Sequence, residues 1–194
     1  MKKDYYHHNY QEYYEKTVHV DPESFLHPLV RRLPRGAEIL DAGCGSGRDL
    51  LWLKKRGFSV TGLERSPGLA ALARKHSGCK VLEGDFSRFD FSRFSADALI
   101  LVGSLVHIPH GDFPGILDSL FTAVRPQGYI LLSLKKGSGQ RTAEDQRIFY
   151  LWQDAELRQI FQQKKCRICD FFTQASFLTA GDIWLAYVLQ KGTG

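Results

Sequence analysis

The sequence predicts an α/β fold: a doubly wound, mostly parallel seven-stranded sheet with helices on both faces and an antiparallel C-terminal hairpin. Short apolar segments alternate with segments of helical length along most of the 194 residues. The first five apolar segments have the continuous apolar character of parallel strands covered on both faces. The last two are joined by a loop alone, which allows them to pair antiparallel.

The expected elements follow the chain in order. A polar, tyrosine-rich segment, Lys2 to Val20, comes first and predicts a helix across its second half. The next helix is expected to start near Pro22 and to end before Pro34, with Asp21 as its N-cap. Strands are expected at Glu38–Ala42, Ser59–Glu64, Lys80–Gly84, Ala96–Val102, Tyr129–Lys135, Arg167–Thr173 and Ile183–Gln190. Helices are expected at Arg48–Arg56, Pro67–His76, Phe113–Val124 and Asp154–Gln163.

The composition indicates a globular protein, with 43% apolar and 24% charged residues. The length suits one domain, in which residues 1–34 are expected to form a helical cap or lid and residues 35–194 a Rossmann-like core. No apolar stretch approaches the roughly 20 residues of a membrane span. The first residues lack the apolar core of a signal peptide, so we expect a cytoplasmic protein without membrane partners.

The net charge of +5 raises the question of a nucleic-acid partner, because phosphate contacts need lysine and arginine. The basic residues are instead scattered as short pairs, which usually lie on solvated faces. These pairs are Arg31-Arg32, Lys54-Lys55, Lys135-Lys136 and Lys164-Lys165. A small-molecule partner is therefore favoured, and a nucleic acid is the alternative.

The four cysteines do not suggest a disulfide framework in a chain of this length. Cys166 and Cys169 form a C-x-x-C pattern, but the strand expected there would send their side chains to opposite faces. A second pair that would complete a zinc site is missing from the sequence. Ordinary strand packing is the interpretation for these two residues, and no metal site is expected.

A glycine loop, Gly43 to Gly47, joins the first expected strand of the core to the next helix. In open parallel sheets ligands bind at the carboxyl ends of the strands, and glycines let the backbone approach them closely. A phosphate loop would end in Gly-Lys-Ser/Thr, but here Gly47 precedes Arg48 and Asp49. A dinucleotide fold would place its third glycine at Arg48, and the carboxylates of Asp41 and Asp49 disfavour a pyrophosphate. A ligand with a positive centre fits better.

Two carboxylates further along predict an adenosyl pocket. Glu64 ends the second strand 21 residues after Gly43, the spacing at which a carboxylate accepts hydrogen bonds from ribose hydroxyls. Asp85 follows the third strand, where it can accept from an adenine amino group while Phe86 packs beside the ring and offers its backbone N–H. The structural alternatives are a solvated carboxylate at Glu64 and an Asp-initiated turn at Asp85.

Taken together, these residues resemble the class I, seven-stranded S-adenosylmethionine-dependent methyltransferases, and most closely their small, single-domain bacterial members. The similar stretches are Ile39-Leu-Asp-Ala-Gly-Cys-Gly-Ser-Gly47, Val60-Thr-Gly-Leu-Glu64, Gly84-Asp85-Phe86, Ala96-Asp-Ala-Leu-Ile-Leu-Val-Gly103 and Val124-Arg-Pro-Gln-Gly-Tyr-Ile-Leu-Leu132. An N-terminal pattern of Tyr6, Asn9, Tyr13 and Thr17 and a Ser104-Leu-Val-His-Ile-Pro109 motif are also similar. The chain departs from the family at Gln127, where glycine is commoner, and along Gly137–Tyr150.

The resemblance implies that S-adenosyl-L-methionine is bound and S-adenosyl-L-homocysteine released. Tyr13 is expected to cover the methionine end of the cofactor. The expected cofactor-binding residues are Tyr13, Asp41, Gly43, Cys44, Gly45, Glu64, Arg65, Asp85, Phe86, Val102 and Gly103.

The expected function is methyl transfer to a small-molecule acceptor, with RNA or protein methylation and a non-catalytic cofactor sensor as alternatives. His107 is the candidate general base, and a purely structural role is its alternative. The N-terminal tyrosines and Gly137–Trp152 are the segments that can enclose an acceptor. The second segment contains Arg141, Arg147, Phe149, Tyr150 and Trp152, which suit an anionic or planar acceptor and equally a lid over the cofactor.

Overall fold

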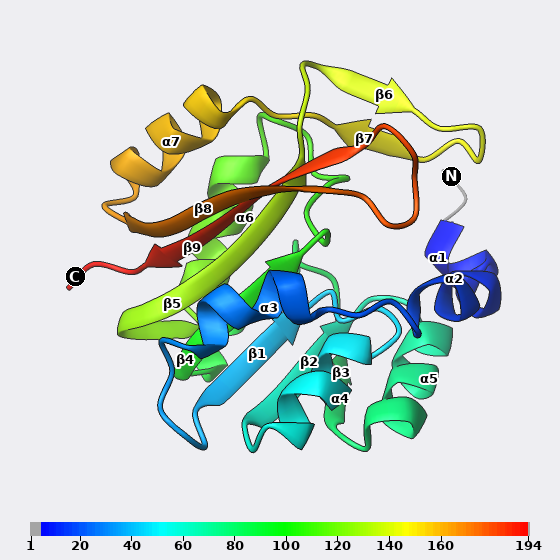
Figure 1. Ribbon diagram of the computed structural model, residues 1–194, viewed down its shortest axis with the longest axis horizontal. Coiled ribbons are helices and arrows are strands. Elements are labelled where there is room, and N and C mark those ends of the chain that lie inside the picture. The colour runs from blue at the N-terminus through cyan, green and yellow to red at the C-terminus, as the bar shows by residue number, and fades with distance from the viewer. Residues whose placement is uncertain (1–4, 194) are drawn as a thin grey trace.

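The computed structural model describes residues 5–193, and its centre is a seven-stranded sheet with the strand order β3-β2-β1-β4-β5-β9-β8 (Figure 1). The strands are β1 (Glu38–Ala42), β2 (Ser59–Glu64), β3 (Lys80–Glu83), β4 (Ala96–Val102), β5 (Val124–Lys135), β8 (Arg167–Ala175) and β9 (Ile183–Gln190). The first five pair in parallel, while β9 is antiparallel to both β5 and β8. The predicted fold class is therefore confirmed.

The chain reverses its direction of winding between β1 and β4. From β1 it builds outward through β2 to β3, and then returns to place β4 and β5 on the other side of β1. The carboxyl ends of β1 and β4 consequently diverge into separate loops, which opens a crevice at this point of a doubly wound sheet. The glycine loop follows β1 and therefore borders that crevice.

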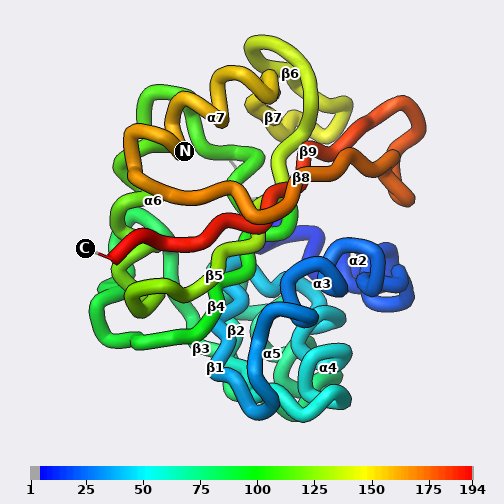
Figure 2. The backbone as a smooth tube through the Cα atoms, turned by 60° about the vertical axis from the view of Figure 1, so that its left-hand side comes forward, coloured from blue at the N-terminus to red at the C-terminus, as the bar shows by residue number. Residues whose placement is uncertain are grey.

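Helices cover both faces of the sheet (Figures 1 and 2). They are α1 (Tyr5–His8), α2 (Tyr10–Thr17), α3 (Glu23–Val30), α4 (Arg48–Lys55), α5 (Pro67–Ser77), α6 (Phe113–Phe121) and α7 (Asp154–Gln163), with a 3-10 turn at Phe91–Arg93. On one face, Leu29 of α3 and Leu53 of α4 pack against the central strands. On the other face, Leu117 of α6 and Phe161 of α7 belong to the larger core cluster. Helices α1 and α2 contact α5 at the crevice side of the molecule.

Most element boundaries agree with the sequence prediction, and the exceptions have local causes. The helix expected to reach Val124 ends at Phe121, because Val124 already pairs with Ala96 in the sheet. Strand β5 accordingly starts five residues before the expected Tyr129. Within this early part Gln127 adopts a left-handed φ of 64°, which explains why glycine is the commoner residue there.

The N-terminal part differs in two details. The N-cap position of α3 is assigned to Pro22, one residue after the expected Asp21, because the Pro22 carbonyl accepts the first intrahelical bond, from the Leu26 N–H at 3.0 Å. The Asp21 carboxylate still accepts a hydrogen bond from the backbone N–H of Glu23 at 3.0 Å. Asp21 therefore satisfies one of the free N–H groups of the first helical turn, although it lies one residue before the N-cap position. The expected helix in the second half of the tyrosine-rich segment is α2, preceded by the short α1. The beginning of that segment, residues 2–4, lies outside the described residues.

A two-stranded sheet that the sequence did not predict follows β5. Its strands β6 (Gln140–Thr142) and β7 (Ile148–Tyr150) are only three residues long, too short for an alternating pattern to be recognised. The Tyr150 backbone N–H donates to the Val106 carbonyl at 2.8 Å, which fixes the hairpin beside the loop that follows β4. The loosely matching segment Gly137–Tyr150 is thus a hairpin at the rim of the crevice.

Cys166 and Cys169 contact the core clusters on opposite faces of the sheet, as predicted. Within residues 5–193, none of the helices is both long enough and apolar enough to cross a lipid bilayer.

Candidate functional site

The glycine loop folds tightly over the carboxyl end of β2. The Gly43 backbone N–H donates to the Leu63 carbonyl at 2.7 Å, and φ is +86° at Gly43 and +52° at Gly45. A Cβ atom on Gly43 would lie 2.4 Å from the Cβ of Ser104, closer than atoms of a folded protein approach. Glycine is therefore required at position 43 for conformation and for space, and the loop backbone forms one wall of the crevice.

Glu64 lies at the end of β2 with its carboxylate turned toward the loop. One oxygen, Oε2, accepts from the Gly45 N–H at 3.0 Å and the other, Oε1, from the Ser66 N–H at 2.8 Å. Burial raises the pKa of Glu64, and these backbone N–H groups oppose the rise. Each oxygen retains lone pairs that can accept from a ligand hydroxyl.

The crevice encloses a cavity of about 280 Å³ between the ends of β1, β2 and β4. Ten of the twelve site residues expected from the sequence line it: Tyr13, Gly43, Gly45, Glu64, Arg65, Asp85, Phe86, Val102, Gly103 and His107. Further residues complete the lining: Tyr6, Leu63, Leu69, Gly84, Ser87, Ser104 and Ile108. The sheet topology thus brings together residues from both ends of the chain.

Asp41 and Cys44 are the two expected site residues that do not line the cavity. Asp41 is buried behind the loop, and its pKa is raised well above the ordinary value by burial and by the nearby Asp49 carboxylate. The Cys44 thiol points away from the cavity, with its Sγ 2.8 Å from the point where a Cβ on Gly62 would lie. Both side chains therefore support the loop from behind.

Asp85 and Phe86 form the wall that follows β3. The Asp85 carboxylate accepts from both the backbone N–H and the hydroxyl of Ser87, at 2.9 and 2.6 Å, so the Asp-initiated turn considered from the sequence is present. Its other oxygen pairs with Arg65 at 3.4 Å. Burial would raise the pKa of Asp85, but the bonds from Ser87 and Arg65 lower it. The Phe86 ring reaches across to the glycine loop, with its Cζ 3.3 Å from a Cβ built on Gly43.

Helices α1 and α2 cover the cavity with two tyrosines. The Tyr13 ring lies 3.4 Å from a Cβ built on Gly45, and burial raises the pKa of its hydroxyl. Tyr6 meets Tyr13 edge to face with 5.0 Å between ring centroids, and its backbone carbonyl accepts from the Ser66 hydroxyl at 2.8 Å. Tyr6 belongs to the N-terminal pattern similar to the family but is not among the twelve expected site residues.

His107 connects the cap to the β6–β7 hairpin. Its Nε2 atom is 2.8 Å from the Tyr6 hydroxyl oxygen, and its Nδ1 atom is 2.5 Å from the Ile148 carbonyl oxygen. The ring also packs against Phe149, with centroids 4.7 Å apart. Burial lowers the pKa of His107 and the positive charge of Arg147 lowers it further, while the hydrogen bond to the Ile148 carbonyl opposes this shift. The net effect favours the neutral imidazole.

Ser104 begins the Ser104–Pro109 motif and lines the cavity, although it is not among the expected site residues. Its hydroxyl oxygen is buried and has no hydrogen-bond partner among the described residues. Such an oxygen next to a cavity is unfavourable unless a ligand or water completes its bonding.

These observations test whether an adenosyl thioether suits the cavity. The lining offers the Glu64 carboxylate for hydroxyl groups, the Ser104 hydroxyl for a further polar atom, and a glycine wall without side chains. Arg65 is the only lysine or arginine in the lining as described, and it pairs with Asp85. Phosphates need several such donors, so the cavity fits a nucleoside with a neutral or positive tail better than a dinucleotide.

Comparison with known proteins agrees with this geometry. Residues 39–128 match the family model of a methyltransferase domain. A malonyl-(acyl-carrier protein) O-methyltransferase of Serratia marcescens is 35% identical over 111 residues, which cover 56% of this chain and 43% of that protein. The alignment thus spans less than half the length of this curated relative.

Solved structures match nearly the whole chain. The magnesium protoporphyrin IX methyltransferase of Synechocystis PCC 6803, with bound SAH (S-adenosylhomocysteine), has a TM-score of 0.77 at 15% identity, covering 98% of both chains. A 1,6-didemethyltoxoflavin-N1-methyltransferase of Burkholderia thailandensis, with bound 1,6-didemethyltoxoflavin and S-adenosylhomocysteine, has a TM-score of 0.74 at 22% identity. It covers 97% of this chain and 84% of its own.

The sheet order and these likenesses define the fold as that of the class I, seven-stranded S-adenosylmethionine-dependent methyltransferases. The fold expected from the sequence is thus confirmed, and residues 39–128 are similar to a methyltransferase domain.

Proposed function

We propose that this protein transfers the methyl group of S-adenosylmethionine to a small-molecule acceptor. The observation that carries the proposal is the Glu64 carboxylate, held by two backbone N–H groups at the rim of a glycine-walled cavity. The methyltransferase-domain match and the relatives with O- and N-methyltransferase names support it.

The chain's own residues divide the binding task. Glu64 accepts from the ribose hydroxyls, while Asp85 and Phe86 hold the adenine ring. Tyr13 covers the methionine end, and Gly103, which has a φ of +65°, turns the chain at the end of β4 so that its backbone borders the ligand. The sulfonium supplies an activated methyl group, so the protein's main task is to align the acceptor with the methyl–sulfur bond. Such alignment is worth on the order of 7–11 kcal/mol in the best cases.

Residues 1–34 were expected to form a cap or lid, and the structure describes this segment from residue 5 onward. Helices α1 and α2 contact α5 and place Tyr6 and Tyr13 over the cavity. Helix α3 has another role, because its buried Leu26 and Leu29 pack on the sheet. The cap that covers the ligand is thus the α1–α2 pair.

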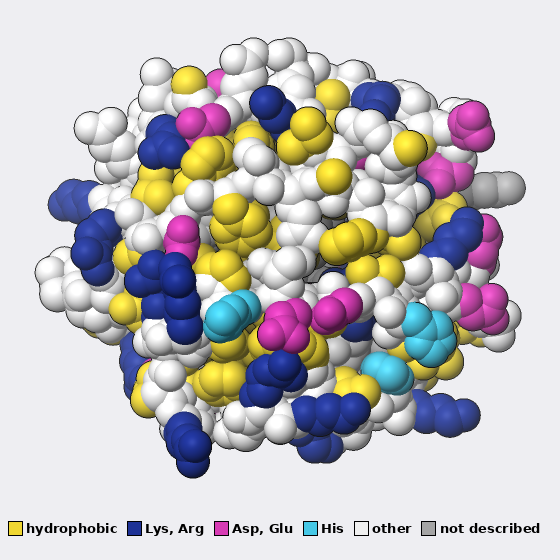
Figure 3. Space-filling model, viewed as in Figure 1, with side chains coloured by type: hydrophobic (Ala, Val, Ile, Leu, Met, Phe, Trp, Pro, Cys, Tyr) yellow, Lys and Arg dark blue, Asp and Glu magenta, His cyan; other side chains and the backbone are white. Residues whose placement is uncertain are grey.

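A small acceptor is favoured over RNA or protein. Figure 3 supports this, since lysine and arginine side chains are dispersed over the visible face with acidic side chains among them. A phosphate backbone would require a continuous basic surface.

Calorimetry combined with a transfer assay tests the proposal. S-adenosylmethionine and S-adenosylhomocysteine should bind more tightly than NAD, and tritiated methyl should pass to at least one member of a panel of phenols, amines, carboxylates and thiols. Binding without transfer to any member would favour the sensor alternative. Absence of binding at millimolar concentration would end the proposal.

A further inference from the structure

The hydrogen bonds of His107 fix the positions of its protons. The Ile148 carbonyl oxygen can only accept, so the His107 Nδ1 atom at 2.5 Å must carry a proton. In a neutral imidazole the other nitrogen, Nε2, then has a free lone pair. The Tyr6 hydroxyl, 2.8 Å from Nε2, must therefore donate its proton to His107.

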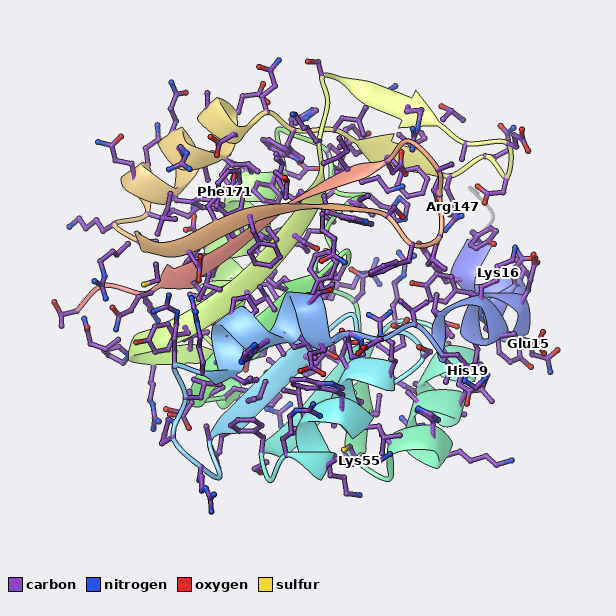
Figure 4. The ribbon with its side chains drawn as sticks, viewed as in Figure 1. Glu15, Lys16, His19, Lys55, Arg147 and Phe171 are labelled. Atoms are coloured by element: carbon purple, nitrogen blue, oxygen red, sulfur yellow. The ribbon has the colours of Figure 1, made fainter. Side chains whose placement is uncertain are left out.

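The Tyr6 hydroxyl oxygen can also accept two hydrogen bonds, and within the described residues the structure shows one of them. Arg147 donates to it at 3.3 Å, and its guanidinium lies 4.1 Å from the centroid of the Tyr5 ring. Figure 4 shows Arg147 extending from the hairpin toward α1. A phenolic oxygen that donates one hydrogen bond and accepts one retains a second lone pair. Tyr6 lines the cavity, where an acceptor molecule would meet it.

We propose that Tyr6 and His107 form a proton relay for methyl transfer, and that the acceptor is a neutral compound bearing an O–H or N–H group. This inference rests on the proposed function and deepens it by naming the acceptor class. Tyr6 is the catalytic residue, because its oxygen contacts the reacting O–H or N–H group. His107 acts through Tyr6 as a positioning residue and as the final holder of the proton.

The step balances as follows. The acceptor's oxygen or nitrogen forms a bond to the methyl carbon, and the methyl–sulfur bond breaks with its electron pair remaining on sulfur. The acceptor's proton passes to the Tyr6 oxygen while the Tyr6 proton passes to His107 Nε2. The imidazolium that results donates from Nδ1 to the Ile148 carbonyl and from Nε2 to the Tyr6 oxygen.

The surroundings of the relay keep His107 neutral before the reaction. Burial and the charges of Arg147, Arg65 and Lys135 lower the His107 pKa, and together they outweigh the hydrogen bond to the Ile148 carbonyl, which raises it. Lys135 is also paired with Asp182, and Arg147 is paired with Asp145 at 2.7 Å. An imidazole in this setting receives a proton only transiently and returns it to solvent after turnover, which suits a relay better than a permanent charge does.

The first experiment needs no acceptor. Nitrogen-15 NMR of histidine in the S-adenosylhomocysteine-loaded protein should show His107 as the neutral Nδ1–H form at pH 7.5, with a pKa below 6.5. A Nε2–H form at that pH would overturn the relay, because Tyr6 could not then donate to His107. Calorimetry should show the same S-adenosylhomocysteine affinity for Tyr6→Phe as for the parent, within about threefold.

The second experiment measures transfer to phenols, amines, carboxylates, thiols and thioethers in Tyr6→Phe, His107→Ala and the control Tyr14→Phe. The Tyr14 ring packs edge to face against His76, a residue of α5, and Tyr14 does not line the cavity. Tyr14→Phe should therefore keep the parental kcat. Tyr6→Phe should lower kcat for O–H or N–H acceptors about 10²- to 10⁴-fold. Added imidazole should partly restore His107→Ala, and the acidic limb of the parental pH–rate profile should disappear in both variants.

The remaining outcomes each decide against the relay. Parental kcat in Tyr6→Phe, or transfer only to thiols, thioethers or carboxylates, overturns the relay but leaves methyl transfer standing. Cofactor binding without transfer to any compound overturns both the relay and the enzymatic proposal. Absence of S-adenosylhomocysteine binding to the parent protein overturns the proposed function itself.

Discussion

Replacing Glu64 by glutamine tests the proposed function at its centre. Glutamine keeps the size of the side chain but removes its charge and turns one carboxylate oxygen into an NH₂ group. Both oxygens accept a backbone N–H, from Gly45 at 3.0 Å and Ser66 at 2.8 Å, so one of these donors must then face another donor. The same substitution removes an acceptor from the ribose hydroxyls.

The size of the effect follows from these contacts. A hydrogen bond to a charged group contributes about 1.5–3 kcal/mol, and Glu64 as a residue is only 8% exposed, so solvent replaces little of the loss. Burial raises the pKa of Glu64 because it disfavours the charged carboxylate. A neutral glutamine avoids this desolvation penalty, which offsets part of the lost hydrogen bonding. We expect S-adenosylhomocysteine binding to weaken by about 1.5–3 kcal/mol, which is roughly 10- to 150-fold in Kd.

Isothermal titration calorimetry at pH 7.5 measures this difference, and thermal denaturation checks that the variant is folded. Glu83→Gln is the matched control, because Glu83 lies on the neighbouring strand β3, pairs with Arg74 at 2.9 Å and does not line the cavity. A folded Glu64→Gln protein whose Kd stays within threefold of the parent would refute the ribose role. An equal loss of affinity in Glu83→Gln would show that binding depends on the overall negative charge of the protein and not on the Glu64 hydrogen bonds.

Two further predictions concern the support of the loop. The pKa of Asp41 is raised by burial and by Asp49, so the folded state binds the Asp41 proton more tightly than the unfolded state and stability falls as pH rises through the folded pKa. Asp41→Asn should therefore stabilise the protein at pH 8 and lose that advantage near pH 4, as urea denaturation at both pH values will reveal. Gly47→Ala should destabilise by about 2–5 kcal/mol, because its φ is +77° and the new Cβ would lie 2.8 Å from the Cα of Ala73. Gly57→Ala, with a φ of +85° and open space, should cost only about 1–2 kcal/mol in the same titration.

The cofactor half of the site could be predicted from the sequence because its determinants are local. Gly43, Glu64 and Asp85 each lie at the carboxyl end of a strand or within two residues of it, and parallel strands bring their carboxyl ends to one edge of the sheet. Spacing along the chain thus fixes spacing in the fold. Asp41 and Cys44 show the limit of this reasoning, since adjacency to the loop does not decide on which side of the loop a side chain lies.

The acceptor half was not predictable in the same way. Its contacts join Tyr6 to His107 and His107 to Ile148, pairs that lie 101 and 41 residues apart. The hairpin that supplies Ile148 has strands of three residues, which carry no recognisable period. His107 could be identified as a candidate from its motif, but the partners that set its proton positions depend on tertiary packing alone.

The cofactor half and the acceptor half of the site should respond differently to substitutions, because different parts of the fold hold them. The glycine loop and Glu64 are held by the buried strands of the main sheet, whereas the described hairpin lies outside that sheet. The Tyr150–Val106 backbone bond, the His107–Ile148 bond and the Arg141–Asp182 ion pair fix it to its surroundings. Peripheral segments with exposed strands open at lower free energy than the central strands do. Substitutions on the outer strand β6, whose three residues are exposed, can therefore alter acceptor entry while cofactor affinity stays constant. Hydrogen exchange should accordingly be faster at Tyr150 than at Leu63.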